Sequence, residues 1–279
     1  MPDIQQMNGF DLEANRDQQV CRYLDFPRLL SLLLSSKLPF IQPDSFGDTW
    51  EGMPNLNDSK LLLTTSLELR PKPLLQHYAV SCWHMHPNES AAMWDKYASK
   101  GFLIQSSVGR LIDSLVDTDH KLMVGRVMYR NPGTTDWVSD FPKCLFQKRE
   151  EYFHEDEFRI VITLSTEERC AIDQCKKNDC DGWGIVQTNK DEFSLLRARY
   201  RTATFNGIHP LKNGLPVAID LDRLIDAIYI SPSLPDWVEE TLKVLLERLG
   251  IEKVVISSNF GQPHPLASTF VKLSLIDKN

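Results

Sequence analysis

The sequence predicts a single α+β domain whose core is a mixed, largely antiparallel sheet flanked by helices. Several short runs alternate apolar and polar residues, as strands with one buried face do, and residues 157–164 are the clearest. Other runs, such as residues 236–249, repeat apolar residues every three or four positions, as amphipathic helices do. No internal repeat and no linker rich in Pro, Ser or Gly divides the chain. We therefore expect one domain over residues 20–279.

The first elements follow from local signals. Residues 1–19 show no periodic apolar pattern and are expected to form a flexible tail. Residues 21–24 suit a short strand. Asp25 is a predicted N-cap, and Pro27 stands in the first turn of a leucine-rich helix. Residues 39–54 contain several Pro, Gly and Asp residues and are expected to form a loop.

The middle of the chain predicts alternating strands and helices. Residues 77–83 are β-branched and aromatic, as in a buried strand. Asn88 is a predicted cap for a helix that carries Trp94 and ends at Gly101. The elements expected next are strands over 102–105, 122–129 and 157–164 and a helix over 108–115.

The polar segment 165–192 is expected to be an insertion or a long loop. It contains Cys170, Cys175 and Cys180. A zinc site usually needs four ligands and closely paired cysteines, so we expect reduced thiols and no metal. The C-terminal third predicts strands over 217–219, 227–231 and 254–257 and helices over 221–225 and 236–249, the last ended by Gly250.

The composition limits the classes of function. With 42% hydrophobic and 25% charged residues, the chain is typical of globular proteins, and collagen, coiled-coil and disulfide-scaffold classes are excluded. The net charge of −7 argues against general nucleic-acid binding, although the alternating cations Arg197, Arg199 and Arg201 form one local basic stripe. No signal peptide and no apolar run of about 20 residues is present, so we expect a cytoplasmic protein without membrane association.

Four clusters that are polar and rich in aromatic residues stand at the ends of predicted elements, and we expect them to converge on one pocket. In the last of them, Glu155 and Glu157 are two positions apart at the start of a predicted strand, so their side chains can share one face. Like charges on one face are tolerated where cations or hydroxyls use them, as in a catalytic site. The alternative is a solvated charged edge that protects the sheet from aggregation. The clusters are residues 22–23, residues 46–51, residues 81–83 with 93–97, and residues 148–159.

These motifs, in this order, resemble the domain-of-unknown-function family numbered 2971 over most of the chain. Gly47 and Thr49 depart from that family's loop, and no activity is implied by the resemblance. The matching motifs are Phe46 to Glu51, Ser81 to Trp83, Met93 to Ala98, and the run Lys148, Glu155, Glu157 and Arg159.

A second resemblance implies a mechanism. Arg22, Ser81 and a Glu-x-Glu follow one another as in the Arg–Ser–Glu pattern of ADP-ribosyltransferases. The resemblance implies that Arg22 contacts the phosphates of NAD and that Ser81 holds the catalytic carboxylate and the nicotinamide ribose. It implies that Glu157 stabilises an oxocarbenium-like transition state and that Glu155 orients or deprotonates the acceptor.

Aromatic side chains add to the expected NAD site. Tyr23, Trp83, Trp94 and Tyr97 are the candidates for binding the cofactor by stacking, although aromatic residues at helical spacing belong more often to a core. His84 and His86 are two apart and could ligate a metal, but a pair without further ligands is a poor metal signal.

Three functions remain open at this level. The first is an NAD-consuming transferase or glycohydrolase, toxin-like or related to phage defence, with a protein or nucleic acid as its unidentified acceptor. The second is a non-catalytic binding module in which the charged run forms a structural ion-pair network. The third is a metal-dependent nuclease that would use Asp48, Glu51, Glu155, Glu157 and Lys148.

Overall fold

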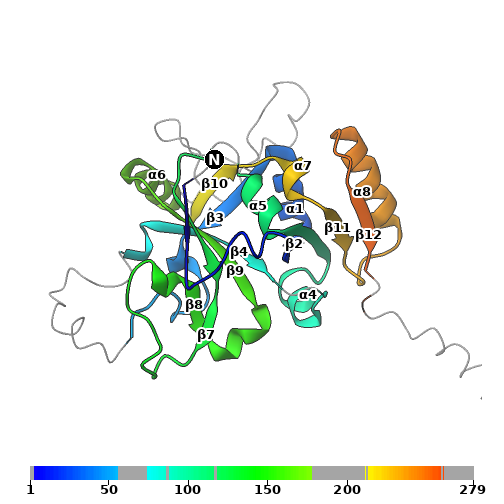
Figure 1. Ribbon diagram of the computed structural model, residues 1–279. Coiled ribbons are helices and arrows are strands. Elements are labelled where there is room, and N and C mark those ends of the chain that lie inside the picture. The colour runs from blue at the N-terminus through cyan, green and yellow to red at the C-terminus, as the bar shows by residue number, and fades with distance from the viewer. Residues whose placement is uncertain are drawn as a thin grey trace, which may run out of the picture.

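The computed structural model describes residues 3–55, 74–85, 88–115, 118–177, 211, 213–258 and 260. These residues form a ten-stranded mixed sheet, largely antiparallel, with helices packed around it (Figure 1). The predicted α+β class is confirmed. No helix in the described ranges is both long enough and apolar enough to cross a membrane.

The order of the strands places distant parts of the chain side by side. The main path runs β1 (Ile4–Gln6), β6 (Leu122–Arg126), β9 (Glu157–Thr163), β4 (Tyr78–His84), β2 (Gln19–Asp25), β5 (Gly101–Ser107), β11 (Ala227–Ile230) and β12 (Val254–Ser257). Strands β3 (Lys37–Ile41) and β10 (Gly214–Ala218) branch from β4, and β7 (Met128–Arg130) and β8 (Gln147–Arg149) form a separate ribbon. Among the described strands of the large sheet, only β1–β6 and β11–β12 are parallel pairs.

The sheet opens between β2 and β4. β2 pairs with β5 along its whole length, and β4 does the same with β9. Between β2 and β4 the register contains one pair, Cys21 opposite His84. β4 meets β3 at a single pair as well, Ile41 opposite Val80. The two strands therefore diverge away from the Cys21–His84 pair, and side chains from both strands line the space between them.

Helix α1 (Phe26–Ser35) begins where the sequence predicts. The Asp25 carboxylate accepts a hydrogen bond from the backbone N–H of Arg28 at 2.9 Å, and Pro27 stands in the first turn. The leucine face of α1 packs against β2, β3 and β5.

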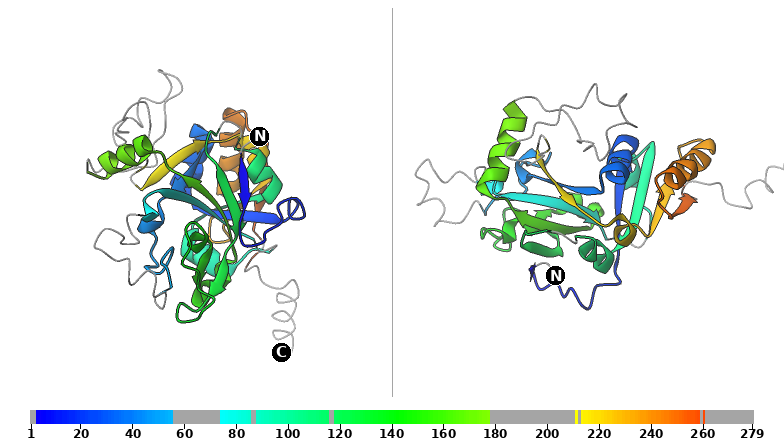
Figure 2. Two further views of the ribbon diagram at one scale, coloured as in Figure 1. Left: turned by 60° about the vertical axis from the view of Figure 1, so that its left-hand side comes forward. Right: turned by 90° about the horizontal axis from the view of Figure 1, so that it is seen from above.

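The other helices lie around the sheet, with α6 and α8 at opposite ends of the molecule (Figures 1 and 2). They are α4 (Ala91–Tyr97), α5 (Val108–Asp113), α6 (Thr166–Lys177), α7 (Leu221–Leu224) and α8 (Trp237–Arg248), with the 3₁₀ helices η1 (Pro43–Ser45), η2 (Lys143–Phe146) and η3 (Glu150–Glu155).

Strand β9 is buried on both faces, which explains its central place in the core. Phe158, Ile160 and Ile162 pack in the main apolar cluster, as their alternation predicts. Val161 points to the other face and packs with a second cluster that includes Phe146. The charged residues of β9, Glu157 and Arg159, both lie at its start, so this end of the strand contributes to the charged cavity described below.

Three predicted segments differ in the structure. The N-terminal stretch expected to be a tail contains β1, and its Met7 and Leu12 are buried. The stretch expected to be a loop after residue 39 begins inside β3, where Phe40 is fully buried. The first part of the expected polar insertion is α6, which buries Ile172; residues 178–192 lie outside the described residues.

Helix α4 begins at Ala91 with Ser90 in the N-cap position, two residues later than the predicted cap Asn88. Gly101 does not end this helix but opens β5. A Cβ atom on Gly101 would lie 2.3 Å from the carbonyl oxygen of Leu24, so the close approach of β5 to β2 requires glycine here.

Candidate functional site

A cavity of about 710 Å³ lies where β2 and β4 diverge. The four sequence clusters all contribute to its wall, so their predicted convergence is confirmed. The lining residues that carry charge are Arg22, Arg28, Asp48, Glu51, Lys96, Lys148, Glu155, Glu157 and Arg159, and the aromatic ones are Tyr23, Phe46, Trp83, Tyr97 and Tyr152.

Arg22 on β2 is held by the neighbouring strand β4. Its Nη1 donates to Ser81 Oγ at 3.0 Å, and its guanidinium lies 5.7 Å from the centroid of the Trp83 ring. Trp83 Nε1 donates to the same hydroxyl oxygen at 3.1 Å. Ser81 is fully buried and lies behind the cavity wall. It therefore positions Arg22 and Trp83 and does not itself line the cavity.

The charge of Arg22 has no carboxylate partner within ion-pair distance among the described residues. Burial lowers the pKa of Arg22 to about 10, and the nearby charge of Arg28 adds to this effect. Arg22 still carries its proton at neutral pH. This half-buried cation at the cavity wall is suited to an anionic ligand group.

Glu157, the first residue of β9, is buried and paired with two cations. Its Oε1 accepts from Lys148 Nζ at 2.8 Å, and its Oε2 accepts from Arg159 Nε at 2.7 Å. Arg159 also donates through Nη1 to the carbonyl of Leu145 at 2.7 Å and through Nη2 to Glu51. Arg159 thus fixes the orientation of Glu157 from a fully buried position.

Glu155 accepts three hydrogen bonds from side chains of the protein, one more than Glu157. Its Oε2 accepts from Lys148, and its Oε1 accepts from Lys96 Nζ at 2.5 Å and from the hydroxyl of Tyr97 at 2.8 Å. The carboxylate is 2% exposed. Both oxygens of Glu155 are therefore occupied by donors in the protein.

The environments of Glu157 and Glu51 move their pKa values apart. Burial raises the pKa of Glu157, but the charges of Arg159 and Lys148 outweigh burial and hold it well below its ordinary value. Burial dominates at Glu51, and the negative charge of Glu157 adds to it, so the pKa of Glu51 is raised despite Arg159. Glu157 is consequently ionised throughout the physiological range.

The turn before β9 sets the geometry of the two glutamates. Asp156, between them, has a left-handed backbone with φ of 35° and ends η3. The carbonyl of Glu155 accepts from His84 Nδ1 at 2.6 Å, and the backbone N–H of Glu157 donates to the Tyr129 hydroxyl at 3.0 Å. The two side chains meet at Lys148 because of this turn. The sequence-based explanation, in which the strand begins early enough to include Glu155, is wrong, because Glu155 lies in η3 and β9 begins at Glu157.

The predicted stacking residues divide into two groups. Trp83 and Tyr97 line the cavity, and Tyr23 lines it with part of its side chain. Trp94 is 3% exposed and does not line the cavity; its ring lies edge-on to Tyr23 at 5.0 Å, and its Nε1 donates to Glu89 at 2.9 Å. Trp94 is therefore a core residue that supports the wall.

Sequence reasoning did not assign several residues that the structure brings to the site. Lys148 has a predicted role only in the nuclease alternative and Arg159 only in the structural ion-pair network of the binding module, although buried carboxylates at this spacing require nearby cations. Lys96 lies between Trp94 and Tyr97 in the helix motif, one helical turn from the wall residue Met93. Glu51 was considered only as a metal ligand.

The arrangement required by a metal-dependent nuclease is not found in the described ranges, where no three His, Cys, Asp or Glu side chains are placed to hold a metal ion. Asp48 forms an ion pair with Arg149, with distances of 3.2 Å from Nε to Oδ2 and 3.1 Å from Nη2 to Oδ1. Cys170 is exposed and Cys175 buried. Cys180, His86 and the stripe of Arg197, Arg199 and Arg201 lie outside the described residues.

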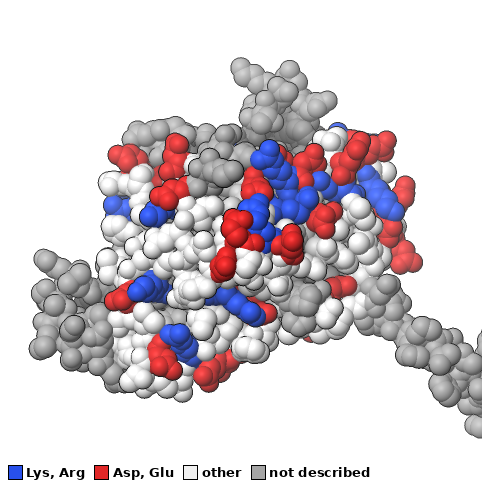
Figure 3. Space-filling view, in the orientation of Figure 1, with Lys and Arg blue, Asp and Glu red and all other residues white. Residues whose placement is uncertain are grey.

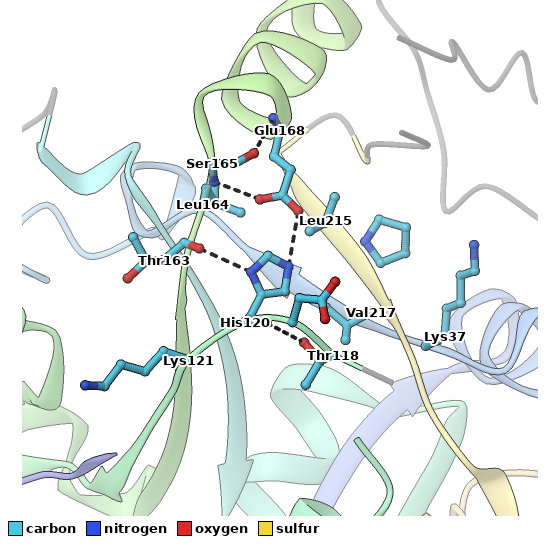
Figure 4. A pocket seen from close by; sticks show the side chains of 13 residues that line it. Lys37, Thr118, His120, Lys121, Thr163, Leu164, Ser165, Glu168, Leu215 and Val217 are labelled. Atoms are coloured by element: carbon cyan, nitrogen blue, oxygen red, sulfur yellow. Dashed lines mark hydrogen bonds and ion pairs between the residues drawn. The ribbon is translucent and has the colours of Figure 1, made fainter. Parts of the chain in front are cut away.

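A second cavity, of about 640 Å³, lies at the far end of β9 (Figure 4). There the two ring nitrogens of His120 face acceptors: Nδ1 lies 3.3 Å from the carbonyl of Thr163, and Nε2 lies 3.1 Å from Glu168. The bond to Glu168 raises the pKa of His120, partly opposed by burial. This ion pair connects the chain before β6 to the first turn of α6.

The surface charges are mixed. On the face shown in Figure 3, Lys and Arg side chains lie among Asp and Glu side chains, and the described residues form no continuous basic surface there. The cavity between β2 and β4, in contrast, brings buried cationic and anionic side chains together within a chain of net charge −7.

Comparison of the chain with family models, with curated proteins and with solved structures found no match. The resemblance to family 2971 therefore stays a prediction. Function is inferred here from the residues and geometry of the site.

Proposed function

We propose that the cavity between β2 and β4 binds NAD and breaks the bond between nicotinamide and ribose, releasing ADP-ribose to water or to an acceptor. One observation carries the proposal. Three neighbouring strands, β9, β4 and β2, bring Glu157 and Arg22 to the wall of one cavity, with Ser81 behind the wall as the hydrogen-bond partner of Arg22, although these residues are far apart in sequence.

The distribution of charge matches the two ends of NAD. The wall formed by β2 and α1 carries Arg22 and Arg28, and the unpaired Arg22 suits a diphosphate because a guanidinium offers five donors. Around the start of β9, three carboxylates, Glu51, Glu155 and Glu157, are paired with three cations, Lys96, Lys148 and Arg159. Of these carboxylates, the ionised Glu157 is the one that we assign to the cationic nicotinamide ribose.

Glu157 is the proposed catalytic carboxylate. Each of its oxygens accepts one hydrogen bond from the protein and keeps a second lone pair, which can accept a ribose hydroxyl. Positive charge develops on the ribose as the bond to nicotinamide breaks. A carboxylate that is already ionised and fixed in place stabilises that charge without reorganising.

The test is release of free nicotinamide from NAD by the full chain and by Glu157→Gln. The substitution keeps the size of the side chain but removes its charge, and we expect turnover to fall by roughly 10²–10³. Because Glu157 is buried and bonded to two cations, we also expect a loss of stability of about 1.5–3 kcal/mol. Rates are therefore compared well below the melting temperature of the variant.

Glu168→Gln is the matched control, because it removes a paired carboxylate that lines the second cavity, at the other end of β9. It should leave turnover unchanged even if it lowers the melting temperature. Equal turnover by wild type and folded Glu157→Gln would contradict the assigned role. No nicotinamide release by the wild type would contradict cleavage itself.

A second candidate function is binding of NAD without cleavage. It is favoured by the complete pairing of Glu155 and Glu157, which is also what a structural ion-pair network requires. In that case calorimetry should detect NAD binding without nicotinamide release. Arg22→Lys should weaken binding about tenfold or more, because lysine cannot span two phosphate oxygens, whereas Arg223→Lys on the surface should not.

A further inference from the structure

The state of Glu155 restricts the acceptor of the proposed reaction. A neutral hydroxyl needs a base to take its proton, and a guanidinium or ammonium group needs an unoccupied carboxylate to hold it. Glu155 is poorly placed for either role, because Lys148, Lys96 and Tyr97 donate three hydrogen bonds to it and its side chain is 2% exposed. An acceptor that is already an anion needs no base.

The surroundings of Glu155 are suited to such an anion. The Tyr152 ring, which lines the cavity, is contacted by three cations: Lys148 at 4.7 Å, Lys96 at 5.1 Å and Arg149 at 5.4 Å from its centroid. Lys96 is 41% exposed. A cationic acceptor approaching Glu155 would meet this exposed ammonium first.

Two of these cations retain hydrogen-bond donors. Lys96 uses one of its three N–H groups on Glu155, and Arg149 uses two of its five on Asp48. Lys96 lines the cavity and Arg149 does not, so the remaining donors of Lys96 can bind a dianionic group there, and the charge of Arg149 on the same Tyr152 ring adds to the attraction. A phosphate monoester is such a group at neutral pH, since its second pKa is about 6.

We propose that the acceptor of this site is a phosphate monoester on a small molecule, bound by Lys96 beside Tyr152, with the charge of Arg149 in support. This inference rests on the proposed cleavage of NAD. A small molecule is favoured over a nucleic-acid strand because the chain has a net charge of −7 and the charges on the face in Figure 3 are mixed.

The step balances without a proton. One phosphate oxygen forms a bond to C1′ of the ribose as the bond from C1′ to the nicotinamide nitrogen breaks. The electron pair of the broken bond leaves with nicotinamide, which becomes neutral. The dianionic monoester becomes a monoanionic diester of ADP-ribose. Glu155 takes no part in proton transfer and acts as a positioning residue for Lys96.

The experiment incubates the full chain with NAD at pH 7.5 and one of four probes: ribose 5-phosphate, ribose, glutarate or agmatine. Mass spectrometry identifies the ADP-ribose adducts, and free nicotinamide is measured in the same samples. We expect an adduct with ribose 5-phosphate and none with the other three. Nicotinamide release with free ADP-ribose as the sole product, or an adduct on ribose, glutarate or agmatine instead, would overturn the inference and leave the proposed function standing. No nicotinamide release with any probe would reject both.

A charge variant tests the assignment of Lys96. Lys96→Gln should lower the ratio of ribose 5-phosphate adduct to hydrolysis product about tenfold or more, through loss of a charge-assisted hydrogen bond. Because the Lys96 side chain is partly exposed, we expect Lys96→Gln to fold as the wild type does. Lys121→Gln, a lysine 52% exposed and paired with Asp3 far from this cavity, is the control and should keep the wild-type ratio. An unchanged ratio in Lys96→Gln would overturn the placement of the acceptor.

Discussion

At the scale of single residues, ion pairing decides which carboxylates of the site stay charged. Arg159 contacts both Glu157 and Glu51, but Lys148 lies 2.8 Å from Glu157 and 3.7 Å from Glu51. Glu157 therefore has two cations in hydrogen-bond contact and Glu51 has one. This difference explains why the pKa of one glutamate is lowered and that of the other raised.

The ion pair between His120 and Glu168 predicts a stability that depends on pH. The folded-state pKa of His120 is raised from 6.5 and that of Glu168 is lowered from 4.5. The contribution is therefore fully present between about pH 4.5 and 6.5. It is lost as pH rises through the raised pKa of His120, and also as pH falls through the lowered pKa of Glu168.

We expect His120→Gln to lower the free energy of unfolding by about 0.2–1 kcal/mol at pH 5.5. The difference in stability between variant and wild type should disappear by pH 9. The measurement is a series of thermal melts from pH 5 to 9. His154→Gln, which changes an exposed histidine, is the control. A gap that stays constant over this range would show that the charge of His120 is not what stabilises the pair.

Residue identity and spacing were enough to find part of the site. Glu155 and Glu157 were predicted because two carboxylates at the start of a strand can share one set of partners. Trp94 is predicted to bind the ligand, yet it is buried in a small core with Tyr23. The sequence does not distinguish these roles, because aromatic residues on one face of a helix have the same spacing whether they pack in a core or stack on a ligand. The sequence also gives no sign that Ser81 faces Arg22 and not the cavity.

At the scale of elements, the turn from η3 into β9 determines the site. Asp156 has a positive φ, and its carboxylate accepts two hydrogen bonds from Arg126, at 3.1 Å from Nε and 2.6 Å from Nη2. Asparagine and aspartate adopt left-handed backbone more readily than most other residues with a side chain, whereas β-branched residues are strained there.

We therefore expect Asp156→Val to destabilise the protein by about 1–3 kcal/mol, because valine is strained at this φ. Asp156→Asn keeps the backbone preference and loses only a half-exposed ion pair, so its cost should stay below about 1 kcal/mol. Urea unfolding of the two variants gives the comparison. Equal destabilisation by both would mean that the pair with Arg126, and not the backbone, holds the turn.

Elements with a complete local pattern were predictable, and those that depend on distant partners were not. α1 and β9 carry their own capping residue or alternation. β1 pairs with residues 122–124, and β3 pairs with residues 214–218 and with Val80. β1 has a single apolar residue, Ile4, and the apolar run of β3 is interrupted by Pro39, which is typical of a loop. In both cases the partner strand, distant in sequence, completes the pairing.

At the scale of the whole molecule, chain topology brings Arg22 and Glu157 to one cavity across 135 positions of sequence. The ordered motifs predicted that the clusters would meet. They could not predict how, because the meeting point depends on the strand order β9, β4, β2 and on the divergence of two of these strands.

The cysteines give a second prediction at this scale. Cys170 is exposed and Cys175 is buried on α6, so these two do not face a common point on the helix. We expect the purified protein to contain no stoichiometric zinc, because three cysteines without a fourth ligand make a poor zinc site. Elemental analysis that finds one equivalent of zinc per chain would contradict this.

The single residue pair between β2 and β4 has a consequence for amide hydrogen exchange. In β2, every second amide is directed toward β5 and lies in a complete ladder, while the alternate amides face β4 along an edge with one pair. We expect protection to alternate along β2, with slow exchange for the amides in the ladder and faster exchange for those facing the opening. Bound NAD should slow exchange of the amides that face β4, because a ligand between the two strands must dissociate before these amides are exposed to solvent. Uniform slow exchange along β2 would mean that the two strands are closed on each other in solution.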